Sequence, residues 1–177
     1  MADSAAGYPA NAQIPVDLFV SKKHPGLTRG DLGFADASGN IVFKVDRKSS
    51  KSSADKRVLL LDSEGNPLIS MHRHHDGSWE GFKGDKDEKD LIFRVRRKGK
   101  TEFEVFLDDS ASELKLKGSA FQKSCTIYKG NAIIAQTSLM YKLRQLFVRR
   151  DKFRLTIFPG FVDHALVAAL IVIFHGG

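Results

Sequence analysis

The segment from residue 161 to residue 174 (FVDHALVAALIVIF) is the longest apolar stretch of the chain, and it constrains the fold more than any other feature. From Ala165 to Phe174 every residue is apolar, so a helix here has no polar face and belongs inside a protein core. A helix of this length extends only about 21 Å, whereas about 20 residues are needed to cross the roughly 30 Å hydrocarbon layer of a membrane. We therefore predict a buried helix over residues 161–174, with Ala165–Phe174 in the core, and no transmembrane span.

The sequence before this segment alternates between apolar and polar residues, which is typical of strands with one buried face. The alternation is clearest at residues 41–46, 91–96, 103–107, 114–117 and 153–157. The pattern Asp-x-x-Gly-Asn occurs twice, at 36–40 and at 62–66, and its glycine and asparagine favour the positive φ angles of tight turns. These features predict a meander of short antiparallel strands joined by hairpin turns.

The buried helix decides between the all-β architectures. The core of a β-sandwich is about 10 Å thick, which leaves no room for a helix about 10 Å wide. A closed barrel of about eleven strands can enclose one. We predict an all-β chain with one central helix, in which a closed antiparallel barrel surrounds the C-terminal helix. Asp163 is expected in the first turn of this helix and Gly176-Gly177 at its end.

A chain of 177 residues is long enough for one domain with a sizeable core. Residues 1–15 are small, polar and interrupted by Pro9 and Pro15, so we predict a disordered leader there and a single domain over 16–177. Cys125 is the single cysteine, lies in an apolar strand, and is predicted to be an unreactive core thiol. Without a disulfide or a secretory pattern, the chain is expected to be intracellular.

The net charge of +7 and the pI near 9.5 predict an anionic partner, such as a phospholipid headgroup, a nucleic acid or an acidic protein surface. Two groups of basic residues are candidate sites for phosphate. The first group is Arg94, Arg96, Arg97, Lys98 and Lys100, and the second is Arg149, Arg150, Lys152 and Arg154. Each cation near an anionic bilayer contributes about 1 kcal/mol, so four or five would give reversible attachment. The alternative is that these side chains only keep the surface soluble and block edge pairing.

A run of serines among basic residues is a candidate for phosphorylation. The serines are Ser49, Ser50, Ser52 and Ser53, in the polar connection that follows Arg47 and Lys48. A phosphate adds about −1.5 to −2 charges and could release a surface held by electrostatic attraction. The alternative is a flexible linker without a regulatory role.

Histidines suggest a metal site, but the pattern is incomplete. His72 and His74 would share one face of a strand, with His75 and Asp76 close by. Zinc needs three or four ligands in a tetrahedron, and no other cysteine or histidine pair has complementary spacing. We therefore expect a solvated strand end, no metal and no cofactor. His164, at the start of the helix, is expected to be a hydrogen-bonded structural residue.

The sequence contains no catalytic signature. A Ser-His-Asp elbow, a phosphate-binding Gly-rich loop, a dinucleotide fingerprint and a carboxylate pair are all missing, so we do not expect an enzyme. Aromatic residues such as Trp79, Phe82 and Phe121 could stack on nucleic-acid bases. Because most of the aromatic residues follow the inward period of strands, core packing is the preferred interpretation, and nucleic-acid binding is a weaker alternative.

Several segments resemble the LURP-one-related proteins of plants, which belong to the Tubby-like and phospholipid scramblase superfamily. The segments are GNIVFKV, KRVLLLDSEGNPLISM, FEVFLDD, LKLKGSAFQKSCTIY and FRLTIFPGFVDHALVAALIVI. The most specific pieces are the Gly-Ser-x-x-x-x-Ser-Cys segment at 118–125 and the ending in which a strand is followed by proline, three residues, aspartate and a helix. The resemblance implies a barrel of about 12 strands around a central hydrophobic helix.

The resemblance also implies a function. Tubby domains bind phosphoinositides, so we expect a non-enzymatic module that binds anionic phospholipid or phosphoinositide at the cytoplasmic surface of a membrane. The expected role is plant defence or stress signalling, with a membrane-tethered transcriptional regulator as one form of it and the nucleus as a second location. No Tubby ligand residue matches a motif here. The alternatives are a scramblase-like protein whose C-terminal helix inserts in lipid, and a lipid-independent protein-interaction scaffold.

Overall fold

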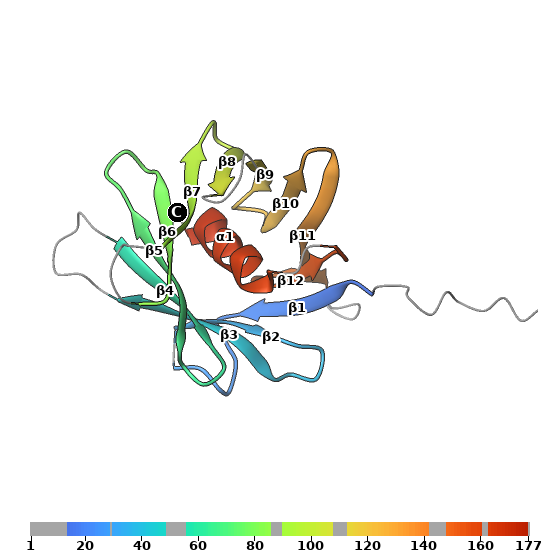
Figure 1. Cartoon of the computed structure of the whole chain (residues 1–177). Coiled ribbons are helices and arrows are strands. Elements are labelled where there is room, and N and C mark those ends of the chain that lie inside the picture. Colours follow the sequence, from blue (N-terminus) through green and yellow to red (C-terminus); the bar gives the residue numbers. More distant parts are fainter. Residues whose placement is uncertain are drawn as a thin grey trace, which may run out of the picture.

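The computed structural model describes residues 14–28, 30–48, 56–85, 90–107, 113–141, 148–160 and 163–176. In this part of the chain, twelve antiparallel strands form one closed barrel around a single helix (Figure 1). The strands are β1 (Val16–Ser21), β2 (Leu32–Ala35), β3 (Ile41–Lys48), β4 (Lys56–Asp62), β5 (Pro67–Arg73), β6 (Trp79–Lys83), β7 (Leu91–Arg97), β8 (Glu102–Leu107), β9 (Glu113–Ser119), β10 (Ser124–Lys129), β11 (Ala132–Tyr141) and β12 (Val148–Ile157). The helix is α1 (His164–Gly176). The predicted fold class is confirmed.

Each strand pairs with its neighbours in the sequence, and β1 closes the ring by pairing with both β2 and β12. Along each strand, side chains alternate between the interior and the outer surface. In β7, for example, Phe93 and Val95 are buried while Arg94 and Arg96 are exposed. The predicted alternation is also confirmed in β8, β9 and β12, where the apolar members of each pair form the core.

The helix α1 lies inside the ring of strands, as Figure 1 shows. Every side chain from Leu166 to Phe174 is buried, which confirms the prediction for that stretch, whereas Ala165 is only partly buried. A helix placed in the middle of the barrel has no outer face, so it needs an apolar residue at every position. Among the described residues, no helix is long and apolar enough to cross a membrane.

The start of α1 differs from the expectation in one detail. Asp163 precedes the helix instead of lying in its first turn, and its Oδ1 accepts a hydrogen bond of 2.9 Å from the backbone N–H of Leu166. This is the geometry of an N-cap, in which a side-chain oxygen satisfies one of the amides that a helix leaves unpaired. The helix therefore begins at His164, and residues 161–162 of the predicted helix lie outside the described residues.

The predicted Asp-x-x-Gly-Asn turns both form. Asp36 Oδ1 accepts backbone hydrogen bonds of 2.9 Å from Ser38 and Asn40. In the second turn, Asp62 Oδ1 accepts hydrogen bonds from the backbone N–H groups of Glu64 and Asn66, which have the same spacing. In each turn, the side chain of the aspartate at the first position thus closes the turn, while the glycine at the fourth position adopts a positive φ. The domain begins with β1 at Val16, and residues 1–13 of the predicted leader lie outside the described residues.

Candidate functional site at the basic end of the barrel

In the connections that the structure describes, the two ends of the barrel carry opposite charge. Because the strands run up and down, successive connections alternate between the end at which α1 begins and the end at which it finishes. In the described connections at the first end, the charged side chains are Asp36, Glu64, Asp85, Asp90 and Asp163. In those at the second end, apart from histidines, they are Lys22, Lys23, Lys98, Lys100 and Lys123 with Asp31 and Asp76. We refer to these as the acidic end and the basic end.

Both predicted basic groups reach the basic end. β7 finishes there with Arg97, and β12 starts there, so Lys98 and Lys100 on one side and Lys152 on the other lie toward the same end. In the strand order, however, β7 and β12 are separated by β8 to β11, so the groups lie on different sides of the ring. The sequence prediction treated them as independent sites, and only the barrel brings them to one end.

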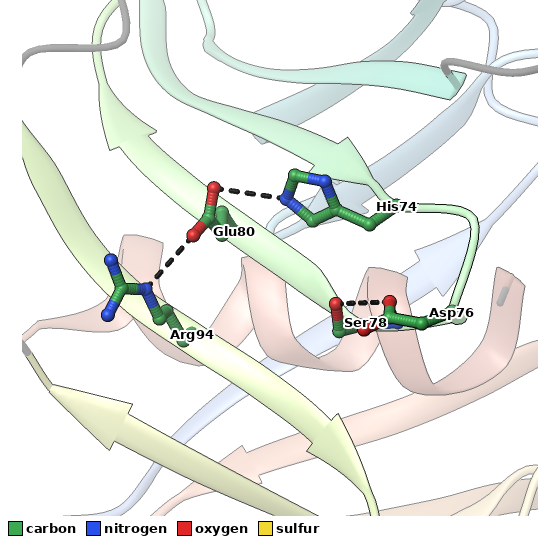
Figure 2. A network of polar contacts seen from close by, with 5 residues as sticks. All are labelled: His74, Asp76, Ser78, Glu80 and Arg94. Atoms are coloured by element: carbon green, nitrogen blue, oxygen red, sulfur yellow. Dashed lines mark hydrogen bonds and ion pairs between the residues drawn. The ribbon is translucent and has the colours of Figure 1, made fainter.

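In the first group, Arg94 is held by a carboxylate of the neighbouring strand (Figure 2). Its Nε donates to Glu80 Oε1 at 2.9 Å, and the other carboxylate oxygen lies 3.0 Å from His74 Nε2. Burial alone would raise the pKa of Glu80, but the hydrogen bonds from Arg94 and His74 outweigh it and hold this pKa below its ordinary value. Glu80 therefore stays ionised and neutralises Arg94.

Three other members of the first group, Arg96, Arg97 and Lys98, also have local partners. Arg96 Nη2 and Lys98 Nζ lie 2.9 Å and 3.0 Å from the carboxylate of Glu104, which is 7% exposed. Their hydrogen bonds hold the pKa of Glu104 below its ordinary value. Arg97 donates to the carbonyl of Gly99 at 3.0 Å, which closes the β7–β8 turn. The glutamates that neutralise these cations come from neighbouring strands, so a local sequence pattern does not show them.

The second group is less neutralised. Lys152 and Arg154 lie on the outer face of β12, opposite Ser21 and Phe19 of β1. In the described part of the chain, no carboxylate lies within ion-pair distance of either side chain. Arg149 and Arg150 belong to β12 by their backbone, but their side chains lie outside the described residues. Lys152 and Arg154 are therefore available for an anionic partner.

A pocket of about 320 Å³ lies beside Lys152, between β1 and the connection to β2. Lys23, His24 and Asp36 line its polar side, while Phe19 contributes to its apolar side. His24 Nδ1 accepts from the backbone N–H of Gly26 at 3.0 Å, so its Nε2 carries the proton and donates to the carbonyl of Gly39 at 2.7 Å. This histidine fixes the connection against the outer wall, and the Asp36 carboxylate reduces the attraction of the pocket for anions.

Three cations gather around the last turn of α1, and we refer to them as the Lys123 cluster: Lys22, Arg47 and Lys123. The Arg47 guanidinium lies so close to Gly176 that a Cβ added to this glycine would be 2.7 Å from Arg47 Nη2. Burial, and then the charges of Lys22 and Arg47, hold the pKa of Lys123 below its ordinary value. Among the described residues, no carboxylate forms an ion pair with this cluster.

Sequence reasoning missed this cluster. Lys22 follows β1, Arg47 lies near the end of β3, and Lys123 is in the β9–β10 turn, so about a hundred residues separate the first from the last. In the sequence Lys22 is next to Lys23 and Arg47 is next to Lys48, and no local pattern connects either of them with Lys123. The one available signal was the alternation of connections between the two ends, which requires the complete list of strands.

The structure does not bring the histidine candidates together as metal ligands. His74 contacts Glu80, and Asp76 Oδ1 accepts from the Ser78 hydroxyl (Figure 2). The His72 ring packs edge-on against Phe82 with 5.3 Å between centroids. Among the described residues, no three potential ligands converge on a point. The backbone of the turn at His74–Ser78 resembles that of the two Asp-x-x-Gly-Asn turns, because the N–H of His74 donates to the carbonyl of Ser78 at 2.9 Å and the N–H of Gly77 donates to the carbonyl of His74 at 3.0 Å.

The remaining candidates have simple placements. Cys125 is 2% exposed, and burial raises the pKa of its thiol to about 12, which agrees with an unreactive core residue. His164 is the first residue of α1 and is half-buried, and its predicted hydrogen bond stays a prediction. The four serines Ser49, Ser50, Ser52 and Ser53 lie outside the described residues.

His175, near the end of α1, predicts a pH dependence of stability. Burial, and then the charge of Lys123, lower its pKa from 6.5 to about 4. A histidine with a lowered pKa in the folded state stabilises the fold above pH 6.5, and this contribution is lost as the pH falls toward 4. Over this range the free energy of unfolding should fall in both proteins. We expect the fall in the His175→Phe variant to be smaller than in the wild type by up to about 3 kcal/mol. Urea unfolding at pH 7 and pH 4.5 would measure it, and parallel losses in the two proteins would contradict it.

Comparison with known proteins agrees with the fold and the sequence pattern. Residues 16–175 match the LURP-one-related family model. The chain is 54% identical over 187 aligned positions to Protein LURP-one-related 7 of Arabidopsis thaliana, with 100% of both chains covered. It is 34% identical to Protein LURP-one-related 15 of the same plant, over 92% of this chain and 80% of the relative. A crystal structure of an Arabidopsis thaliana protein matches with a TM-score of 0.65 and 30% identity, covering 90% of this chain and 89% of the other. This chain therefore belongs to the LURP-one-related family.

Proposed function

We propose that this protein is a non-enzymatic module that binds anionic phospholipid at a membrane surface through the basic end of its barrel. The observation that supports the proposal is the separation of charge between the two ends. Lys22, Arg47 and Lys100 are exposed at the basic end, and Lys123 is half-buried beside them. The acidic end would be repelled by the same surface. A barrel with this polarity would meet an anionic bilayer with one orientation.

The expected strength is that of a reversible peripheral contact. Each lysine or arginine close to an anionic bilayer contributes about 1 kcal/mol, and the effect decays within a Debye length of about 8 Å at physiological salt. Cations such as Arg94 and Arg96 add little, because Glu80 and Glu104 already neutralise them. A phosphoinositide headgroup carries several phosphates at one point, so it would be attracted more strongly than a headgroup with a single charge.

The cellular role that fits this activity is recruitment to the cytoplasmic face of a membrane in plant defence or stress signalling. In one form of this role the module would tether a transcriptional regulator, and release from the membrane would allow it to enter the nucleus. Phosphorylation of Ser49, Ser50, Ser52 or Ser53 would add negative charge close to Arg47 in sequence and would favour release.

The test is to remove the same number of charges from each end. The variant Lys22→Ala/Lys100→Ala removes two exposed lysines from the basic end. The matched control Lys83→Ala/Lys129→Ala removes two exposed lysines from strand ends at the acidic end. We expect the first variant to bind vesicles containing phosphatidylserine roughly 30-fold more weakly than the wild type, since two contributions of about 1 kcal/mol are lost. The control should bind like the wild type.

Co-sedimentation with vesicles across a range of salt concentrations provides the measurement. Binding of the wild type should decrease as salt increases, because screening weakens the attraction. Equal loss of binding in the two double variants would show that only net charge matters and would contradict docking through the basic end. A wild type that does not bind acidic vesicles at physiological salt would overturn the proposal and support the lipid-independent interaction scaffold instead.

A further inference from the structure

The β9–β10 turn displays an aromatic side chain at the basic end. Phe121 is 70% exposed, far more than Phe106 at 40% or Ile133 at 44%. Within the turn, the backbone N–H of Gln122 donates to Ser119 Oγ at 3.3 Å and the N–H of Lys123 donates to the carbonyl of Ala120 at 3.3 Å. A partner that covers this ring would remove its apolar surface from water, which is favourable.

The turn is also anchored to the barrel. The buried hydroxyl of Thr137 donates to the carbonyl of Lys123 at 2.9 Å and accepts from the backbone N–H of Cys125 at 2.8 Å. The two strands that the turn connects, β9 and β10, pair with each other directly next to it, with Ser119 opposite Ser124 and Gly118 opposite Cys125. Phe121 is therefore presented from a fixed support, so little conformational entropy would be lost when it enters a partner.

We propose that Phe121 inserts into the interfacial layer of an anionic bilayer when the basic end docks, while the Lys123 cluster contacts the lipid phosphates. This inference rests on the proposed function and identifies the part of the basic end that enters the membrane. An aromatic ring beside basic side chains matches the boundary between acyl chains and headgroups, because the ring takes the apolar layer and the cations take the phosphates.

The charges around Phe121 favour a membrane over another apolar partner. Lys123 is two residues away in the same turn, and Lys22 and Arg47 act on it electrostatically. Ile133, by contrast, lies at the acidic end of β11, next to Lys129 at the end of β10 and away from the Lys123 cluster. Phe106 lies on the side wall with the Arg96 guanidinium 5.3 Å above its ring. Of these three exposed apolar side chains, Phe121 alone combines exposure with the cation cluster.

The backbone of Lys123 gives independent support. Its φ is +54°, in the left-handed region, and among the described non-glycine residues it is the one with a positive φ. Glycine adopts this conformation without the steric penalty of a Cβ, so a lysine here adds strain to the turn. Strain of this kind is characteristic of functional positions. What the lysine provides at this position, and glycine would not, is a positive charge next to Phe121.

A tryptophan reporter tests the insertion directly. In the Phe121→Trp variant, emission should shift to the blue and be quenched by brominated acyl chains when phosphatidylserine vesicles are added. Trp79 is 4% exposed in the core, so the wild-type protein supplies its background signal. Vesicles of phosphatidylcholine alone should produce neither change. Emission that stays at the aqueous wavelength while the variant co-sediments with acidic vesicles would overturn the inference.

Affinity measurements separate this inference from the proposed function. Phe121→Ala should bind acidic vesicles about 10-fold more weakly, whereas Ile133→Ala, at the acidic end, should bind like the wild type. Lys123→Gly should melt at the same or a higher temperature than the wild type and still bind more weakly. If the wild type binds and Phe121→Ala binds equally well, the insertion is wrong and the proposed function stands. If the wild type does not bind, both fail.

Discussion

Replacing Gly118 with alanine is expected to abolish the stable fold. A Cβ at this position would lie 2.1 Å from the carbonyl oxygen of Ser124 and 2.9 Å from Cys125 Cα, and the φ of Gly118 is +155°. Both obstructing atoms belong to the backbone of β10, so they cannot move without breaking the β9–β10 pairing. We expect a loss of more than about 4 kcal/mol, which approaches the lower end of the roughly 5–15 kcal/mol by which native domains are stable.

Soluble yield and thermal unfolding followed by circular dichroism would measure this effect. The matched control is Gly99→Ala in the β7–β8 turn, where an added Cβ meets no atom within 4 Å. This control should unfold within a few degrees of the wild type. A Gly118→Ala protein with a cooperative transition near the wild-type temperature would contradict the close approach of the two strands.

The Gly118 geometry explains why the Gly-Ser-x-x-x-x-Ser-Cys segment has its residues at that spacing. Gly118 lets β10 approach, Ser119 Oγ accepts the Gln122 amide, and Cys125 fills a small buried space opposite the glycine. The segment is therefore the structural support of the β9–β10 turn. Its four central positions contain Phe121 and Lys123, the residues that we propose to meet the membrane.

The second large effect is expected in the middle of α1. Leu170 has 0% exposure and lies inside the barrel, so Leu170→Ala removes buried apolar contacts and leaves a cavity that twelve paired strands cannot close. We expect a loss of roughly 4 kcal/mol in the free energy of unfolding, within the range of buried leucine truncations. Leu170→Met conserves most of the volume and should lose less than about 1.5 kcal/mol.

Denaturant titration of the two variants would measure the difference. A loss below about 1 kcal/mol for Leu170→Ala would contradict a helix packed in the barrel and would favour the scramblase-like alternative, in which the helix leaves for lipid. The structure gives a reason to expect the larger value. Leu166 to Phe174 are all buried, so moving α1 into a bilayer would remove the side chains that pack against the apolar interior of the barrel and would leave a large cavity there.

Local patterns predicted the elements that depend on local interactions. The period of two in Leu91–Arg97 and in Phe153–Ile157 marks one buried face, and the structure confirms both. The Asp-x-x-Gly-Asn turns were predictable because the aspartate bonds amides two and four residues later. The N-cap role of Asp163 was missed by one position, since a cap and a first-turn residue look alike until the hydrogen bond is seen.

Pairing across strands could not be predicted in the same way. Arg94 and Glu80 are fourteen residues apart, and Arg96 and Glu104 are eight apart, yet each pair lies side by side on adjacent strands. The sequence shows a run of cations at 94–100 but not the glutamates that neutralise it. Phe106 differs, because the local alternation of its own strand already places it on the outer surface.

The apolar segment at the end of the chain by itself determined that a helix is buried, and the alternating strands before it determined that a barrel must surround that helix. Both conclusions follow from local physics, because the apolar length and the side-chain period are properties of neighbouring residues. Only the tertiary structure decided where charge accumulates. Lys22, Arg47 and Lys123 lie together because the end of β3 and two separate connections lie at one end of the ring, and electrostatic interactions depend on distance in space, not on distance along the chain.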